Sequence, residues 1–167
     1  MADFQQCKGK FIDTWGTLGA QWGINKTMAQ IHALLLIAAE PINADQIISE
    51  LHISQGNANM NIRALIEWDL VRKIQKTGMR CDYYVAEKDI HTVFKTILER
   101  RKQKELDPLI EELKALKSCL HCGEEQKEFS EMLGNITDFV LKANTALDTL
   151  IKADSHWFFN TLMKILK

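Results

Sequence analysis

Apolar side chains recur at intervals of three and four residues over most of this chain, the spacing expected of helices with one buried face. The first such run predicts a helix from about residue 4 to residue 22, ended by Gly23. Its expected buried face consists of Phe4, Cys7, Phe11, Trp15, Leu18 and Trp22.

A second, strongly apolar helix is expected between Asn25 and Pro41, with Asn25 as its N-cap. Because nearly every turn of this segment carries large aliphatic side chains, we expect it to lie in the core. The inward positions are Met28, Ile31, Leu34, Leu35 and Ala38.

Two shorter helices follow, each with a recognisable start. Asn43 and Gln46 have capping-box spacing before a helix whose buried stripe is Ala44, Ile47, Ile48 and Leu51, and Ser54 is the N-cap of the next. That next helix, to about Glu67, turns Ala58, Ile62 and Leu65 inward and Gln55, Asn57, Asn59, Asn61 and Arg63 outward. Carboxamide side chains compete with helical backbone bonds, so a role other than helix stability is indicated for them.

The period changes to two after Trp68 and Asp69. Residues 70–75 and 81–85 are rich in β-branched and aromatic side chains, and they flank a basic turn that contains Gly78. This pattern predicts a β-hairpin with a basic tip.

Helical periodicity returns from Ile90 and continues to the end of the chain. Asp107-Pro108 predicts a break or kink and the start of a new helix. Leu106, Leu109, Leu113, Leu116 and Leu120 then form a heptad seam, which we assign to dimerisation or to packing against the following helix. The following helix has an expected inward face that consists of Phe129, Met132, Leu133, Ile136, Phe139, Val140, Ala143, Leu147, Leu150 and Ile151. Asp154 is expected to cap a last helix from Trp157 to Leu166.

The order of these elements predicts a mainly α fold with a small β-hairpin wing: a winged helix-turn-helix plus long C-terminal dimerisation helices. We place the winged helix-turn-helix domain at 1–105, its N-terminal helix contributing to the dimer region, and a helical dimerisation arm at 106–167.

The outward residues of the helix after Ser54 suit the edges of DNA bases. Asn and Gln pair with adenine in the major groove, and Arg63 matches guanine. Gly56 permits close backbone approach, and Ser54 with the first amide groups of the helix can bind a phosphate. Lys76 and Arg80 at the hairpin tip are expected to reach an adjacent minor groove or its phosphates.

Charge supports a local basic surface rather than a basic protein. The chain has 21 basic and 22 acidic side chains, a formal charge of −1. Any attraction to DNA must therefore come from one region. Between Arg63 and Arg80 the basic residues outnumber the acids, which are Glu67 and Asp69.

The stretch from Ser54 to Lys73, continued through Gly78–Tyr84, Ile97–Arg101 and Glu105–Pro108, resembles the MarR-type winged-helix regulators, and most closely their GbsR-like branch. The resemblance covers about Phe4 to Pro108. It implies a homodimeric repressor that binds double-stranded DNA, with an effector pocket between the DNA-binding and dimer regions. By that resemblance the residues that read DNA are Ser54, Gln55, Asn57, Asn59, Asn61 and Arg63, and the wing contacts are Lys73, Lys76 and Arg80.

Two other interpretations of the chain stay open. Cys119, His121 and Cys122 are soft ligands that suit zinc or copper, or a redox response, although a closed zinc site needs four ligands. Alternatively, the winged helix is a protein-interaction module that never binds DNA. The salt dependence of binding separates DNA binding from a protein interaction, because contacts to DNA phosphates release counterions.

The remaining features narrow the class of protein. Trp15 and Trp22 are candidates for an effector pocket through cation–π attraction. The chain lacks a phosphate loop, a nucleophile elbow and a zinc-protease motif, so we expect no enzyme and no cofactor. We expect a cytoplasmic protein with reduced cysteines, because neither a secretion signal nor a membrane-length apolar run is present.

Overall fold

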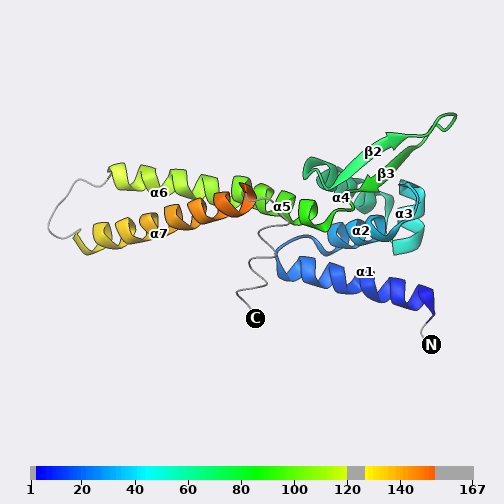
Figure 1. Cartoon of the computed structure of the whole chain (residues 1–167), viewed down its shortest axis with the longest axis horizontal. Coiled ribbons are helices and arrows are strands. Elements are labelled where there is room, and N and C mark those ends of the chain that lie inside the picture. The colour runs from blue at the N-terminus through cyan, green and yellow to red at the C-terminus, as the bar shows by residue number, and fades with distance from the viewer. Residues whose placement is uncertain (1–2, 120–126, 153–167) are drawn as a thin grey trace. The chain divides into compact units, whose positions relative to one another are not determined.

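A computed structural model describes residues 3–119 and 127–152 of the chain (Figure 1). The chain forms two compact units, Met1–Val93 and Phe94–Lys167. Within the described ranges, the first unit contains four helices and a small sheet, and the second is a helical hairpin.

The core of the first unit is built around α2 (Lys26–Ile37), against which α1 (Phe4–Gln21) and α4 (Gln55–Glu67) pack. Ile31 and Leu35 of α2 are fully buried, together with Ile62 of α4. The side chain of Asn25 accepts a hydrogen bond from the backbone N–H of Met28, so the predicted N-cap of α2 is confirmed.

The packing face of α1 differs from the expected one. Ile12, Gly16 and Gly19 are its buried residues, whereas Phe4, Cys7, Phe11, Leu18 and Trp22 are exposed and Trp15 is half-buried. A Cβ atom at Gly19 would lie 2.5 Å from the Cβ of Ala29, and one at Gly16 would lie 2.6 Å from the Cγ of Gln30. The glycines therefore let α1 approach α2 closely, and the apolar stripe points away from this core.

The sheet has three antiparallel strands in the order β1-β3-β2. Strands β2 (Val71–Gln75) and β3 (Asp82–Ala86) form the predicted hairpin. Strand β1 (Ile42–Asn43) was not predicted, since two residues carry no periodicity; Ile42 pairs with Tyr84 and Asn43 with Tyr83. The sheet thus connects the start of α3 (Ala44–Leu51) to the base of the hairpin.

Lys88, which follows the sheet, forms hydrogen bonds to carbonyl groups at the C-terminus of α2. The Nζ of Lys88 donates to the carbonyl oxygens of Leu35, Leu36 and Ala38 at 2.8, 2.6 and 2.8 Å. These carbonyls have no partner within the helix, so an ammonium group satisfies them and also complements the helix dipole. Burial lowers the pKa of Lys88.

The second unit consists of part of α5 (Ile90–Arg101), the π-helical turn η1 (Lys102–Leu106), α6 (Asp107–Cys119) and α7 (Lys127–Lys152). The expectation of a new helix capped at Asp107 is not met, because the chain stays helical through Asp107, which itself has right-handed helical φ and ψ. Its N–H bonds to the carbonyl of Lys102, five residues back. This wider turn accommodates Pro108, which lacks an N–H and crowds the preceding turn of a regular helix.

Helices α6 and α7 pack side by side as a hairpin (Figure 1). On α6, Ile110 and Leu113 are buried and Leu106 is half-buried, whereas Leu109 and Leu116 are exposed. The predicted leucine seam is therefore only partly used within the hairpin, and Leu120 lies outside the described residues. The inward assignment of α7 is also wrong at Phe129, Met132, Ile136, Phe139, Ala143 and Leu150, all of which are exposed.

The chain is mainly helical with a small antiparallel sheet, and the predicted fold class is confirmed. The capped helix expected from Asp154 onward lies outside the described residues. None of the helices within residues 3–119 and 127–152 is long and apolar enough to cross a membrane.

Candidate nucleic-acid interface

Helices α3 and α4 are joined by a tight turn that sets the direction of α4. His52 adopts φ 52°, a left-handed conformation, and the N–H of Ile53 bonds to the carbonyl of Ile48. The capping box of Asn43 and Gln46 starts α3, as predicted. Both helices therefore begin and end at sharply defined residues, which fixes the helix-turn-helix geometry.

The first turn of α4 is open to solvent. The Oγ of Ser54 accepts from the N–H of Asn57 at 3.3 Å, which confirms Ser54 as the N-cap. Ser54, Gln55 and Gly56 are exposed, and a Cβ at Gly56 would meet nothing within 4 Å. The positive end of the helix dipole is thus accessible to an anion such as a DNA phosphate.

The outer face of α4 carries Asn59 and Arg63 as exposed residues, as predicted. Between them lies Met60, with 59% of its surface exposed. Met60 is absent from the DNA-reading residues predicted from the sequence, although its spacing from Arg63 places it on the same face. An apolar side chain here can contact the methyl group of thymine, so the face combines polar and apolar chemistry.

Asn61 does not belong to this face. It is only 3% exposed, and its Nδ2 donates to the backbone oxygen of Asn57 at 2.8 Å and to the Oδ1 of Asn57 at 2.7 Å. The expectation that Asn61 reads DNA is therefore wrong, because the helical period turns position 61 inward beside Ile62. Asn57 is half-buried and held in place by Asn61.

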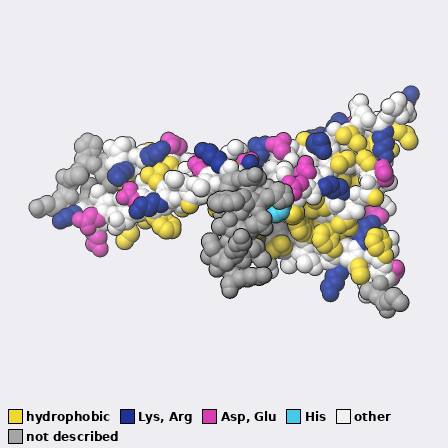
Figure 2. Space-filling view, viewed as in Figure 1, with side chains coloured by type: hydrophobic (Ala, Val, Ile, Leu, Met, Phe, Trp, Pro, Cys, Tyr) yellow, Lys and Arg dark blue, Asp and Glu magenta, His cyan; other side chains and the backbone are white. Residues whose placement is uncertain are grey.

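The hairpin turn forms the tip of the wing. Gly78 has φ +82°, as the tight turn requires, and the N–H of Met79 bonds to the carbonyl of Lys76. The Nζ of Lys76 lies 4.6 Å from the centre of the Tyr83 ring, and Arg80 is exposed. Figure 2 shows a basic side chain at this tip.

Lys73 is exposed, but its charge is engaged by an ion pair. Its Nζ lies 2.7 Å from the Oδ2 of Asp82 on the neighbouring strand. The hydrogen bond and charge of Asp82 raise the pKa of Lys73. Lys73 therefore stays protonated, but its charge is offset by a carboxylate.

Tyr84 connects the wing to α4. Burial and the negative charge of Asp82 raise the pKa of the Tyr84 hydroxyl, while the positive charges of Lys73 and Arg63 act in the opposite direction. Arg63 on α4 and Lys73 on β2 thus lie within electrostatic range of one hydroxyl group. Helix α4 also packs against strand β2. We call the outer face of α4 and the wing, taken together, the α4–wing surface.

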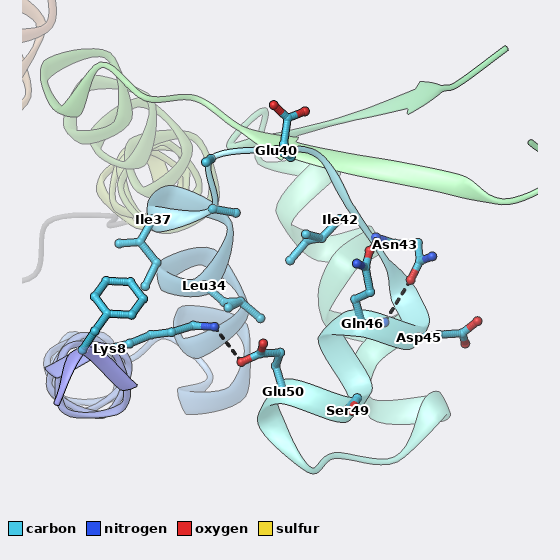
Figure 3. A pocket seen from close by; sticks show the side chains of 13 residues that line it. Lys8, Leu34, Ile37, Glu40, Ile42, Asn43, Asp45, Gln46, Ser49 and Glu50 are labelled. Carbon is cyan, nitrogen blue, oxygen red and sulfur yellow. Dashed lines mark hydrogen bonds and ion pairs between the residues drawn. The ribbon is translucent and has the colours of Figure 1, made fainter. Parts of the chain in front are cut away.

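The first unit also contains a cavity of about 660 Å³ between α1, α2, β1 and α3 (Figure 3). Leu34, Ile37 and Ile42 contribute apolar side chains, and Lys8 forms an ion pair with Glu50 at 2.7 Å. Trp15 and Trp22 do not line this cavity. Trp15 instead contacts the rings of Phe11 and His32.

Of the candidate metal ligands near the end of α6, His121 and Cys122 lie outside the described residues, and so does the side chain of Cys119. Among the residues that are described, no group of three or more His, Cys, Asp or Glu could hold a metal ion.

No protein-family model and no curated protein matches the sequence. A solved crystal structure described as that of a transcriptional regulator is similar in fold. Its TM-score is 0.65, with 16% identity over 87% of this chain and 95% of the other. The chain shares the fold of that regulator. The similar region spans most of both chains.

Proposed function

We propose that this protein is a sequence-specific, double-stranded-DNA-binding transcriptional regulator. The observation that carries the proposal is the α4–wing surface. It joins a solvent-exposed helix N-terminus, an outer face of Gln55, Asn59, Met60 and Arg63, and a hairpin tip bearing Lys76 and Arg80. The fold similarity to a transcriptional regulator supports the same function.

Each part of the surface has a distinct task in this proposal. Arg63 pairs with guanine, Gln55 and Asn59 pair with adenine, and Met60 contacts a thymine methyl group. The N-terminus of α4 binds a phosphate and fixes the register of the helix in the major groove. Lys76 and Arg80 neutralise phosphates beside the neighbouring minor groove.

The sequence from Ser54 to Lys73 and the observed fold together support membership of the MarR-type regulators and their GbsR-like branch. In this proposal the protein is a homodimer, and its two α4 helices enter successive major grooves about one helical turn apart. In this proposal the bound dimer represses transcription because it covers the promoter. Deleting the gene should raise expression from a reporter under the protein's own operator, and a fall would identify an activator instead.

The cavity between α1 and α3 is our candidate for an effector site. A ligand there would contact α3, which packs on α4, and could therefore change the position of the DNA-reading helix. Replacing Leu34 would damage the core, so Ile37→Glu is the better test, because Ile37 is 42% exposed. An effector that releases wild-type protein from DNA should fail to release this variant.

The function is tested by selecting duplexes from a random library with the purified full-length protein. Enrichment of a two-fold symmetric sequence, bound more tightly than its shuffled version, is the expected result. A folded protein that enriches no sequence would contradict the proposal and favour the protein-interaction module.

A further inference from the structure

Two asparagines one helical turn apart are hydrogen-bonded to each other in α4. Asn57 lies in the first turn of the helix, where its N–H donates to the Oγ of Ser54 at 3.3 Å. Asn61 lies four residues later and is only 3% exposed. The Nδ2 of Asn61 donates to the backbone oxygen of Asn57 at 2.8 Å and to its Oδ1 at 2.7 Å. These two bonds use both hydrogens of that amide nitrogen.

The two bonds determine which way round the side-chain amide of Asn57 is held. A backbone oxygen can only accept, so the atom of Asn61 that contacts it must be the amide nitrogen rather than the amide oxygen. The same nitrogen lies 2.7 Å from the side-chain amide of Asn57, which must therefore turn its own oxygen toward Asn61. The Oδ1 of Asn57 is thus directed at a buried partner.

The Nδ2 of Asn57 is left to face outward. It has no hydrogen-bond partner within residues 3–119 and 127–152, and it is not one of the buried atoms that lack a partner. Asn57 itself is half-buried. The group that this residue offers to a molecule on the α4–wing surface is therefore an amino group with two N–H donors. A free carboxamide would offer a donor and an acceptor instead.

We infer that Asn57 donates to a base edge made of acceptors, and that it selects guanine. The inference rests on the proposed function, because it requires α4 to lie in a major groove. Guanine presents N7 and O6 side by side as acceptors, whereas adenine presents an acceptor and a donor, and cytosine a donor. The first residues of a recognition helix are those that contact base edges, and Asn57 is the third residue of α4.

The usual pairing of asparagine with adenine is disfavoured at this position. That pairing needs the amide to present its oxygen and its nitrogen together to the base. The oxygen of Asn57 can do so only by leaving Asn61, whose buried N–H would then lack an acceptor. The loss of a buried hydrogen bond and the gain from a bidentate base contact each amount to roughly 10- to 100-fold in an equilibrium constant. Adenine therefore gains little over other bases.

Asn57 and Arg63 contact different base pairs in this arrangement. Six residues of helix separate them, which is about 9 Å along the helix axis. Successive base pairs are only about 3.4 Å apart. The preference that each residue imposes can therefore be measured separately on one DNA site.

Selection from a random duplex library with the full-length protein tests the inference. The base pair that Asn57 contacts is the one whose preference is lost in Asn57→Ala, and we expect guanine there in the wild-type selection. Asn57→Asp keeps the shape of the side chain and the acceptor that faces Asn61, but it replaces the outward amino group by a carboxylate oxygen. The preference at this base pair should therefore change from guanine to cytosine, whose N4 amino group is a donor.

Asn59→Asp is the matched control. Asn59 is exposed on the same helix, and the Nδ2 of Asn61 bonds to Asn57 instead of Asn59. The control adds the same negative charge, so it should weaken binding to all duplexes as Asn57→Asp does. It should nevertheless leave guanine at the base pair that Asn57 contacts.

A base analogue tests the contact at a single atom. Replacing the selected guanine by 7-deazaguanine removes the N7 acceptor and leaves the base pair itself intact. The affinity of the wild type, measured by fluorescence anisotropy, should fall about 10-fold, whereas that of Asn57→Ala should change by less than about twofold.

Asn61→Ala tests the positioning role of Asn61. Once the Oδ1 of Asn57 is released, its amide can turn and pair with adenine. The variant should then accept adenine as well as guanine at this base pair and keep its preference at the one that Arg63 contacts. A purely structural role would lower affinity without changing the base chosen at a single position. If circular dichroism shows that this variant does not fold, the Asn57 variants and the analogue decide the inference.

The inference and the proposed function fail in different ways. A base other than guanine at the Asn57 position of the wild-type selection would overturn the inference alone. So would a guanine preference that persists in Asn57→Asp, or a selected sequence that Asn57→Ala leaves unchanged at every position. A folded protein that enriches no sequence would instead defeat the proposed function, and this inference with it.

Discussion

The side chain of Asn61 donates two hydrogen bonds to Asn57, one to its backbone oxygen at 2.8 Å and one to its Oδ1 at 2.7 Å. Asn61 is buried and Asn57 is half-buried at the edge of the outer face of α4. Two carboxamides that look equivalent in the sequence thus have different roles. Asn61 orients Asn57, and only Asn57 is within reach of a ligand on that face.

Replacing Asn61 should therefore reduce stability as well as DNA recognition. Asn61→Ala removes both bonds and leaves a small cavity, and we expect the free energy of unfolding to fall by about 1–3 kcal/mol. Urea denaturation measures this change. Gln55→Ala, at an exposed position of the same helix, is the control and should stay within about 0.5 kcal/mol of wild type. Equal stability of the two variants would remove the positioning role of Asn61.

Substitution by alanine should have opposite effects on stability at Gly19 and at Gly9. Alanine at Gly19 places a Cβ 2.5 Å from the Cβ of Ala29. The resulting separation of α1 from α2 should cost about 1–3 kcal/mol. A Cβ added at Gly9 would meet nothing within 4 Å, so Gly9→Ala should stabilise the helix by up to about 1 kcal/mol. Thermal denaturation of both variants checks the pair, and a stabilised Gly19→Ala would contradict the glycine-mediated contact.

His32 should make the stability depend on pH. Burial lowers the pKa of His32 from 6.5 to about 4. The unfolded chain therefore takes up a proton at a higher pH than the folded one, so stability is complete above pH 6.5 and falls as the pH drops toward 4. Between pH 7 and pH 5 the loss should be about 2 kcal/mol.

Urea denaturation at pH 7 and pH 5 measures the effect, with His32→Phe as the comparison. The variant should lose less stability than wild type over this interval, because it has no group to protonate at position 32. An identical pH dependence in the two proteins would show that His32 is not the cause.

Arg63 should determine specificity. If Arg63 pairs with guanine, Arg63→Ala should weaken binding to the selected duplex by about 1–3 kcal/mol and relax the preference at a single base pair. Repeating the selection with the variant shows which position loses its preference. A variant that enriches the same sequence as wild type would remove this role from Arg63.

The wing should contribute charge rather than specificity. Lys76→Ala should weaken all duplexes similarly and flatten the slope of log affinity against log salt by about one unit. Asp82→Asn should do the reverse, because it releases Lys73 from its 2.7 Å ion pair. Fluorescence anisotropy across a salt series measures both slopes, and a loss confined to one sequence would contradict the assignment.

The sequence predicted best what is decided locally. The caps at Asn25, Asn43 and Ser54 depend on a side chain and a backbone N–H three residues away, so they can be read from spacing alone. The order of helices and hairpin was likewise recoverable, because period and turn residues specify it.

What the sequence could not specify is the partner of an apolar face. On α1 the stripe through Phe4 and Phe11 predicts a core face, yet Gly16 and Gly19 make the contact with α2. Periodicity identifies an apolar stripe, but not whether a neighbouring helix or a second molecule covers it. Likewise, the carboxamides that the sequence predicted to face outward on α4 included Asn61, which is buried. Composition alone does not show which side of a helix a polar residue faces.

The most direct test of the account is the affinity of the purified wild-type protein for its selected duplex and for a shuffled duplex, measured over a series of salt concentrations. We expect tight binding to the selected duplex with one dimer per site, weaker binding to the shuffled one, and a steep decline of both affinities with salt. A folded protein whose affinity is equal for the two duplexes, or insensitive to salt, would contradict sequence-specific DNA binding through the α4–wing surface.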